Sequence, residues 1–173
     1  MPDAAAALFL ARAEARLASL AAALSEASTP REAAWILCEF AGRELTLVDV
    51  VVYLRDADGS LVQQAAWGPK RAADHVLESR IRLASGQGIV GSCAQQCRPL
   101  RVADTRLDAR YVTDDQVNLS ELAVPIQRDS VLFGVLDSEH PQADYFDPAH
   151  ERAMSMFAGH CAARLQALAD QAG

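Results

Sequence analysis

Residues 120–140, SELAVPIQRDSVLFGVLDSEH, contain three carboxylates that could act together: Glu121, Asp137 and Glu139. The two halves of this stretch have the alternating, β-branched pattern of strands, and the polar letters QRDS between them have turn composition. If the strands pair antiparallel about that turn, the alternation places the three carboxylates on one face of one sheet. We interpret this face as the floor of a polar pocket. The alternative interpretation is a solvated sheet face with charged strand ends.

Four further residues are expected to contribute to this pocket. Trp67 and Tyr111 could cover a cationic ligand with their rings, and such a cation–π contact is worth about 0.5–2 kcal/mol. Ser120 and Asp104 could supply further polar contacts. Three carboxylates on a half-buried face repel one another, so at least one should have a raised pKa in the empty site. The pattern therefore favours a ligand that carries an amine, such as an amino-acid-like molecule.

Composition places the chain among globular proteins with one domain. The sequence has 173 residues, of which 51% are hydrophobic, and it carries a formal net charge of −7. Acidic balance disfavours non-specific nucleic-acid binding, which depends on Lys and Arg at the phosphates. No apolar run is long enough to cross a bilayer, and the start does not resemble a secretory signal. We expect a cytoplasmic protein with neither a nucleic-acid nor a membrane partner.

The four cysteines, Cys38, Cys93, Cys97 and Cys161, form no CxxC pair and have no histidine at zinc-finger spacing. A structural metal site is therefore not expected, and nothing in the sequence calls for a cofactor. Cys93 and Cys97 are four residues apart and would face the same way on a helix. We expect both to be buried packing residues, with a redox pair as the alternative.

An alanine-rich helix is predicted for residues 4–27. Leu10, Leu17 and Leu24 recur every seven residues, which makes a short seam suited to packing against another helix. A second apolar stripe follows residues 154–168 near the C-terminus. We predict that these terminal helices form a homodimer, with residues 1–28 as the dimerisation helix.

The rest of the chain predicts a single α+β domain with a central antiparallel sheet. A capping box at Thr29 begins a second helix, and a last helix follows Asp147. Between them we expect strands and one short helix, at residues 48–54, 61–67, 81–83, 88–97 (the helix), 99–102 and 120–140 (the hairpin). We expect the terminal helices to cover one face of the sheet and the loops of residues 68–119 to roof a pocket on the other.

The letters GQGIVG at residues 86–91 match GxGxxG, a pattern that binds dinucleotides when it opens a βαβ unit. Here the motif follows antiparallel-looking strands in the middle of the chain. We interpret it as a glycine-rich entry to the helix at residues 88–97.

Several segments together resemble a GAF domain: LASGQGIVGSCAQQCRPLRVADTRLDARYV, NLSELAVPI, VLFGVLDSEH and YFDPAHERAMSMFAGHCAARL. The resemblance covers roughly residues 30–169, and we place the domain at residues 29–170. It implies a sheet that packs against the N- and C-terminal helices and a small-molecule pocket on the opposite face. Because GAF domains have many functions, the subclass must be judged on individual residues.

Three ligand classes of that family fit poorly. The signature of the cyclic-nucleotide receptors is absent from the sequence. A bilin site commonly has a cysteine followed by histidine, but Cys97 precedes Arg98 and Cys93 precedes Ala94. A haem would need a histidine in the pocket, and His75 is the only candidate, more simply explained as a solvated loop residue.

Free methionine-R-sulfoxide reductases are the nearest enzyme class within the resemblance. Their substrate-binding acids lie in segments similar to SELAVPI and GVLDSEH, and they correspond to Glu121, Asp137 and Glu139 here. The resemblance therefore extends to the acids that would hold an amino-acid-like ligand.

The reactive thiols of those reductases do not carry over. The expected cysteines correspond to Val90 and Asp114 here, and residues 61–83 contain none. Asp49 stands near the place of a tryptophan in the first strand. Since a thiolate nucleophile is indispensable to that reaction, the acids without the thiols indicate a sensor rather than an enzyme.

We therefore predict a small-molecule-sensing regulatory GAF module of a signal-transduction protein, for example a two-component system. A ligand would act by population shift, biasing how the terminal helices pack across the dimer. The alternatives are a thiol reductase that uses Cys93 and Cys97, and a dimerisation module without a ligand.

Overall fold

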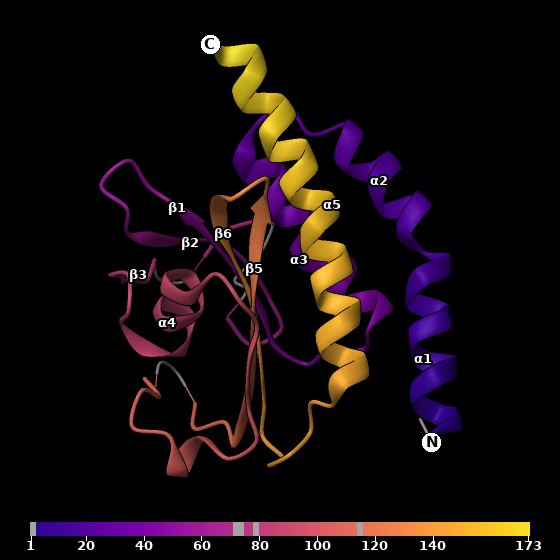
Figure 1. The fold of residues 1–173 in the computed structure, drawn as a ribbon, viewed down its shortest axis with the longest axis vertical. Helices are drawn as coiled ribbons and strands as arrows, with labels where there is room; N and C mark the ends of the chain where they lie inside the picture. The colour runs from indigo at the N-terminus through magenta and orange to yellow at the C-terminus, as the bar shows by residue number, and fades with distance from the viewer. Residues whose placement is uncertain (1–2, 71–74, 78–79, 114–115) are drawn as a thin grey trace.

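A six-stranded antiparallel sheet lies at the centre of the chain, with strand order β3-β2-β1-β6-β5-β4 (Figure 1). The computed structural model describes residues 3–70, 75–77, 80–113 and 116–173. The strands are β1 (Val50–Arg55), β2 (Leu61–Trp67), β3 (Arg82–Leu83), β4 (Leu100–Val102), β5 (Ser120–Arg128) and β6 (Val131–His140). The helices are α1 (Ala4–Ala15), α2 (Leu17–Ser25), α3 (Pro30–Glu44), α4 (Gly88–Gln96) and α5 (Pro148–Ala172), with a 3-10 turn η1 (Thr105–Leu107). The predicted α+β class and sheet are confirmed.

The β5–β6 hairpin forms as the sequence predicts, with its turn at Asp129 and Ser130. Asp129 and Ser130 connect the strands with φ angles of 49° and 66°, the left-handed pair of a type I′ turn. This turn matches the right-handed twist of the strands, and a register shift between Ile126 and Gln127 then sets the pairing of Glu121 with Glu139 and of Ala123 with Asp137. The three carboxylates therefore lie on one face of adjacent strands.

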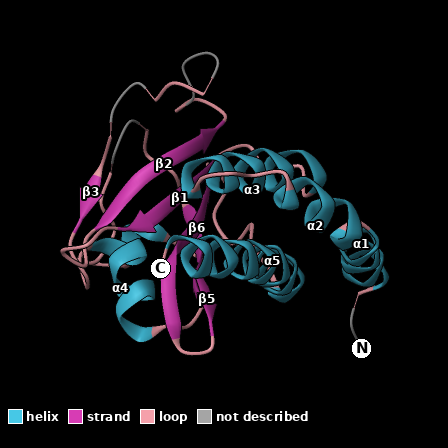
Figure 2. Cartoon of the chain, turned by 90° about the horizontal axis from the view of Figure 1, so that it is seen from above, coloured by secondary structure: helices cyan, strands magenta, loops and turns pink. Residues whose placement is uncertain are grey.

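Helices α3 and α5 cover the other face of the sheet (Figure 2). Thr29 caps α3 by accepting a hydrogen bond from the Glu32 backbone N–H at 3.2 Å, as the capping box predicts. Fully buried side chains from both helices and the sheet, such as Phe157 and Leu122, make up the main apolar core. In the described part of the chain, no helix combines the length and apolar character needed to span a membrane.

The N-terminal region forms two helices rather than the single predicted one, with a break at Arg16. The Arg16 guanidinium pairs with Glu44 at 2.9 Å. Its leucine seam packs within the chain, where α1 contacts α5 and α2 contacts both α3 and α5. Leu20 and Leu24 are 0% and 1% exposed. Leu10 and Leu17 are only partly buried, so the seam is covered in part within the chain, and the dimerisation helix stays a prediction. The homodimer itself stays a prediction.

Helix α4 lies over the face of the sheet that carries the carboxylates (Figure 1). Glycines open it as expected, since a Cβ on Gly91 would lie 2.5 Å from the Ala84 carbonyl oxygen. Cys93 on α4 is buried as predicted, but Cys97 is exposed, which corrects that prediction. The reason is that α4 ends there, with Cys97 in the left-handed conformation at φ 49°.

Candidate functional site

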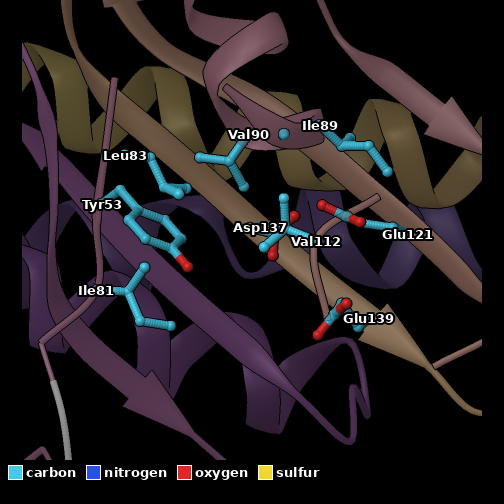
Figure 3. A pocket seen from close by; sticks show the side chains of 10 residues that line it. Tyr53, Ile81, Leu83, Ile89, Val90, Val112, Glu121, Asp137 and Glu139 are labelled. Atoms are coloured by element: carbon cyan, nitrogen blue, oxygen red, sulfur yellow. The ribbon is translucent and has the colours of Figure 1, made fainter. Parts of the chain in front are cut away.

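A small cavity of about 40 Å³ lies between the sheet and α4 (Figure 3). It has an acidic side and an apolar side; in Figure 3, Asp137 lies between Tyr53, Ile81 and Leu83 on one side and Glu121 and Glu139 on the other. The lining residues are Tyr53, Ile81, Leu83, Gly88, Ile89, Val90, Val112, Glu121, Asp137 and Glu139. A cavity of this size admits a water-sized group or a little more.

Cross-strand pairing brings the three predicted carboxylates together. Glu121 lies opposite Glu139, and Asp137 lies opposite Ala123, one pair further along the same face. Their side chains are not solvated: Glu121, Asp137 and Glu139 are 5%, 3% and 4% exposed. The alternative of a solvated sheet face is therefore wrong. Carboxylates this buried are rare unless they are paired or protonated.

Burial is the first cause that raises the pKa of both Glu121 and Asp137 well above the ordinary range. The negative charges within the cluster raise both values further, and the positive charge of Lys70 opposes the rise. The Glu121 carboxyl also hydrogen-bonds to Asp137, which favours a protonated Glu121 as donor and an ionised Asp137 as acceptor. The two residues therefore hold a proton that a cation could replace.

A buried lysine completes the cluster, and sequence reasoning missed it. The Lys70 Nζ lies 2.9 Å from Glu139 Oε2 and 3.3 Å from Asp49 Oδ2, and Lys70 is only 5% exposed. Asn118 also donates to Glu139 Oε2 from Nδ2 at 3.3 Å. One signal could have drawn attention to this residue: of 16 basic Lys and Arg residues, Lys70 is the single lysine.

One carboxylate oxygen of a cavity-lining residue has no hydrogen-bond partner among the described residues. This atom is Asp137 Oδ1, which is fully buried. An ionised oxygen left in this state carries a desolvation cost of about 1–3 kcal/mol or more. One of the two Asp137 oxygens therefore lacks a donor among the described residues.

Tyr111 lies beside this cluster but does not line the cavity, and its predicted role as cover for a ligand stays a prediction. Its Oη accepts a hydrogen bond from the Asn118 backbone N–H at 3.1 Å. Burial, followed by the charge and hydrogen bond of Glu139, raises the pKa of Tyr111. The phenol therefore stays neutral next to Glu139.

Trp67 is on the opposite side of the sheet, which corrects its predicted place over the ligand. Its Nε1 donates to the Leu47 carbonyl at 3.0 Å, and its ring packs so closely on Gly42 that an added Cβ would lie 2.4 Å away. The cause is a register shift between β1 and β2. The neighbouring β1 residues Val52 and Tyr53 pair with Ala65 and Gln63, so β2 has one extra residue at this point. An extra residue in a strand moves the following side chains to the other face.

Ser120 and Asp104 also lie outside the cavity. Ser120 shares the alternation of Leu122, so it faces the helices, and its Oγ donates to the Gln142 carbonyl at 2.7 Å. Asp104 caps the short turn η1, accepting from the Arg106 backbone at 3.0 Å and pairing with the Arg106 guanidinium at 2.7 Å. Both residues satisfy local backbone, and neither contributes to the pocket as predicted.

The described residues do not form a haem site or a reactive-thiol site in the cavity. His75 stacks on Trp35 with ring centroids 4.5 Å apart and has Nε2 3.1 Å from Glu39 Oε1, so it is not in the cavity. Burial first, then Asp137, raises the pKa of the Cys93 thiol, which disfavours a thiolate. Asp114 lies outside the described residues. Within the described ranges, no group of His, Cys, Asp and Glu could hold a metal ion.

Solved structures with the same fold include a methionine sulfoxide reductase and GAF domains of other proteins. The free methionine-R-sulfoxide reductase of Neisseria meningitidis, solved with its substrate, is 19% identical with a TM-score of 0.80, covering 100% of this chain and 96% of that one. The GAF domain of a phosphoenolpyruvate-protein phosphotransferase from Coxiella burnetii is 18% identical with a TM-score of 0.80, covering 94% and 98%. At these identities the similarity establishes the fold alone.

Sequence comparison identifies the family. The protein YtsP of Bacillus subtilis is 27% identical over 106 residues, which span 61% of this chain and 60% of the relative. The GAF domain model matches residues 30–165, close to the range predicted from the motifs. This chain belongs to the GAF domain family.

Proposed function

We propose that this GAF domain is a regulatory module that binds a small cationic molecule, an ammonium or amine, in the acidic cavity. The observation that carries the proposal is Asp137, a cavity-lining residue whose buried Oδ1 has no hydrogen-bond partner among the described residues. Glu121 and Glu139 line the same cavity. An ammonium group would supply both the missing donor and the missing positive charge.

Cavity size limits which part of a ligand can enter. A volume of about 40 Å³ suits an ammonium or methylammonium group, whereas a full amino acid would require the apolar wall to move. That wall includes Ile81 and Val112, which come from different loops. Aliphatic contact with this wall favours an amine carrying a small alkyl group over a bare metal cation.

Binding would be transmitted through the β5–β6 hairpin. Glu121 and Asp137 face the cavity, while their neighbours Leu122 and Leu136 pack in the core against the helices. A charge change on one face of the hairpin can therefore bias the packing of α5 on the other, as population shift requires. In a cytoplasmic homodimer, which we also propose, α5 would carry the signal to its output.

Thiol-reductase activity is the rival function, because such enzymes share this fold. It would need a reactive thiolate at the cavity. Cys93 is buried beside Asp137 and Glu121, which raise its pKa, and Cys97 is exposed and does not line the cavity. We therefore expect no reduction of a free sulfoxide amino acid with a thiol donor, and steady turnover in that assay would refute the regulatory assignment.

The binding proposal is tested with methylammonium chloride against sodium chloride at equal ionic strength. We expect a saturable rise in melting temperature with methylammonium, absent in the Glu121→Gln and Asp137→Asn variants. Asp129→Asn is the matched control, because Asp129 is an exposed acid at the turn of the same hairpin. The proposal fails if the parent does not respond, or if the two cavity variants respond like the control.

A further inference from the structure

The carboxylate cluster of the cavity already contains a cation, which contacts Glu139. Lys70 is the single lysine of the chain, and its ammonium is buried between Glu139 and Asp49. Lys70 is separated from Glu139 by 69 residues, so the contact is made by the fold rather than by local sequence. The inference that follows rests on the proposed function, since it concerns how this lysine affects an amine in the cavity.

Glu139 is shared between Lys70 and the cavity. Its Oε2 accepts from Lys70 at 2.9 Å and from Asn118 at 3.3 Å, while Glu139 also lines the cavity next to Asp137. An amine that enters the cavity would therefore put a second positive charge beside a carboxylate that already holds one. Two positive charges that contact the same buried carboxylate repel strongly, because water screens them little there.

We propose that Lys70 is an internal ligand of the acidic cavity, and that its ammonium competes with an incoming amine for Glu139. The competition lowers the affinity of the site for cations and makes binding depend on a shift of Lys70 away from Glu139. Asp49 can retain the displaced ammonium, because it already lies 3.3 Å from Nζ. In this arrangement the lysine stabilises the empty site and is exchanged when the ligand arrives.

A purely structural counter-ion would behave differently. If Lys70 only neutralises Glu139 and Asp49, then replacing the lysine together with one acid should leave amine affinity unchanged. The Asp49→Asn, Lys70→Met double variant makes this comparison at constant charge, because it removes one positive and one negative charge together. It also avoids leaving Asp49 buried as an anion after its lysine is lost.

We expect this double variant to bind methylammonium at least about tenfold more tightly than the parent, measured by calorimetry at matched ionic strength. Equal affinity in the two proteins, within twofold, would overturn the inference while leaving the proposed function intact. If neither protein binds methylammonium, both proposals fail. Thermal unfolding of the double variant checks that it folds before affinities are compared.

A second measurement needs no substitution. Lysine labelled with ¹³C and ¹⁵N in its side chain gives one side-chain signal from the whole chain, that of Lys70. We expect this signal to shift during a methylammonium titration. The dissociation constant from the shift should equal the one measured by calorimetry. A Lys70 signal that stays fixed while the cavity fills would show that the lysine does not compete.

Discussion

The two faces of the sheet bury their side chains by opposite means, although adjacent residues of one strand supply both. Leu122 is 0% exposed in an apolar core under α5, while Glu121, next to it, is 5% exposed among other carboxylates. On the helix face, burial removes apolar area from water and stabilises the fold. On the cavity face, burial of charge costs stability and stores a preference for a cation. The helix face therefore stabilises the structure, whereas the cavity face is the one that we propose binds a ligand.

Truncation on the helix face should have the largest effect. We expect Leu122→Ala to lower the free energy of unfolding by about 2–5 kcal/mol, because it leaves a cavity in a closely packed core. Chemical denaturation measures this directly. A loss below about 1 kcal/mol would mean that this face is not the main source of stability.

The N-terminal helices should behave as part of the same core. Leu20→Ala is expected to cost about 2–4 kcal/mol, since Leu20 is fully buried within the chain. Because the contact is intramolecular, the loss should be the same at every protein concentration. A destabilisation that vanishes on dilution would instead place this leucine in an interface between chains.

On the cavity face, an isosteric change should stabilise the protein. Glu121→Gln removes a buried acid and keeps a donor for Asp137, so we expect a gain of about 1–3 kcal/mol at pH 8 in the absence of amines. A carboxyl with a raised folded-state pKa contributes stability that is fully present below its unfolded-state pKa and is lost as pH rises through the folded-state value. Parent stability should therefore fall with rising pH, and the fall should be shallower in the variant. Unfolding measured from pH 4 to pH 9 tests both expectations.

Substitutions of Cys93 and Cys97 should differ in their effect on stability, because Cys93 is buried and Cys97 is exposed. Cys93→Ala is expected to cost about 1 kcal/mol because Cys93 is buried, and Cys97→Ala should change stability by less than about 0.5 kcal/mol. A thiol reagent should label the folded protein at Cys97 only. Rapid labelling of Cys93 would contradict its burial beside Asp137.

The features that could be predicted from sequence are those that depend on residues close together in the chain. The alternation in residues 120–140 predicted that Glu121, Asp137 and Glu139 share a face, but their meeting also depends on the register shift between Ile126 and Gln127, which alternation alone does not reveal. Trp67 was misplaced because the irregularity in β2 changes its face, and no turn residue marks that irregularity. Lys70 was missed because it meets Glu139 only through the fold. The leucine seam indicated a packing surface, but not whether its partner lay in the same chain.

The most direct test of the account is the titration of Glu121 and Asp137 by carboxyl ¹³C NMR, with and without methylammonium. We expect both carboxyls to have pKa values above the ordinary range in the empty site, since burial raises them first, followed by the charge of Asp137 on Glu121 and that of Glu139 on Asp137. Methylammonium should lower the pKa of both, because a cation favours the ionised form. If both pKa values are ordinary, or are the same with and without the amine, the acidic cavity is not a cation site.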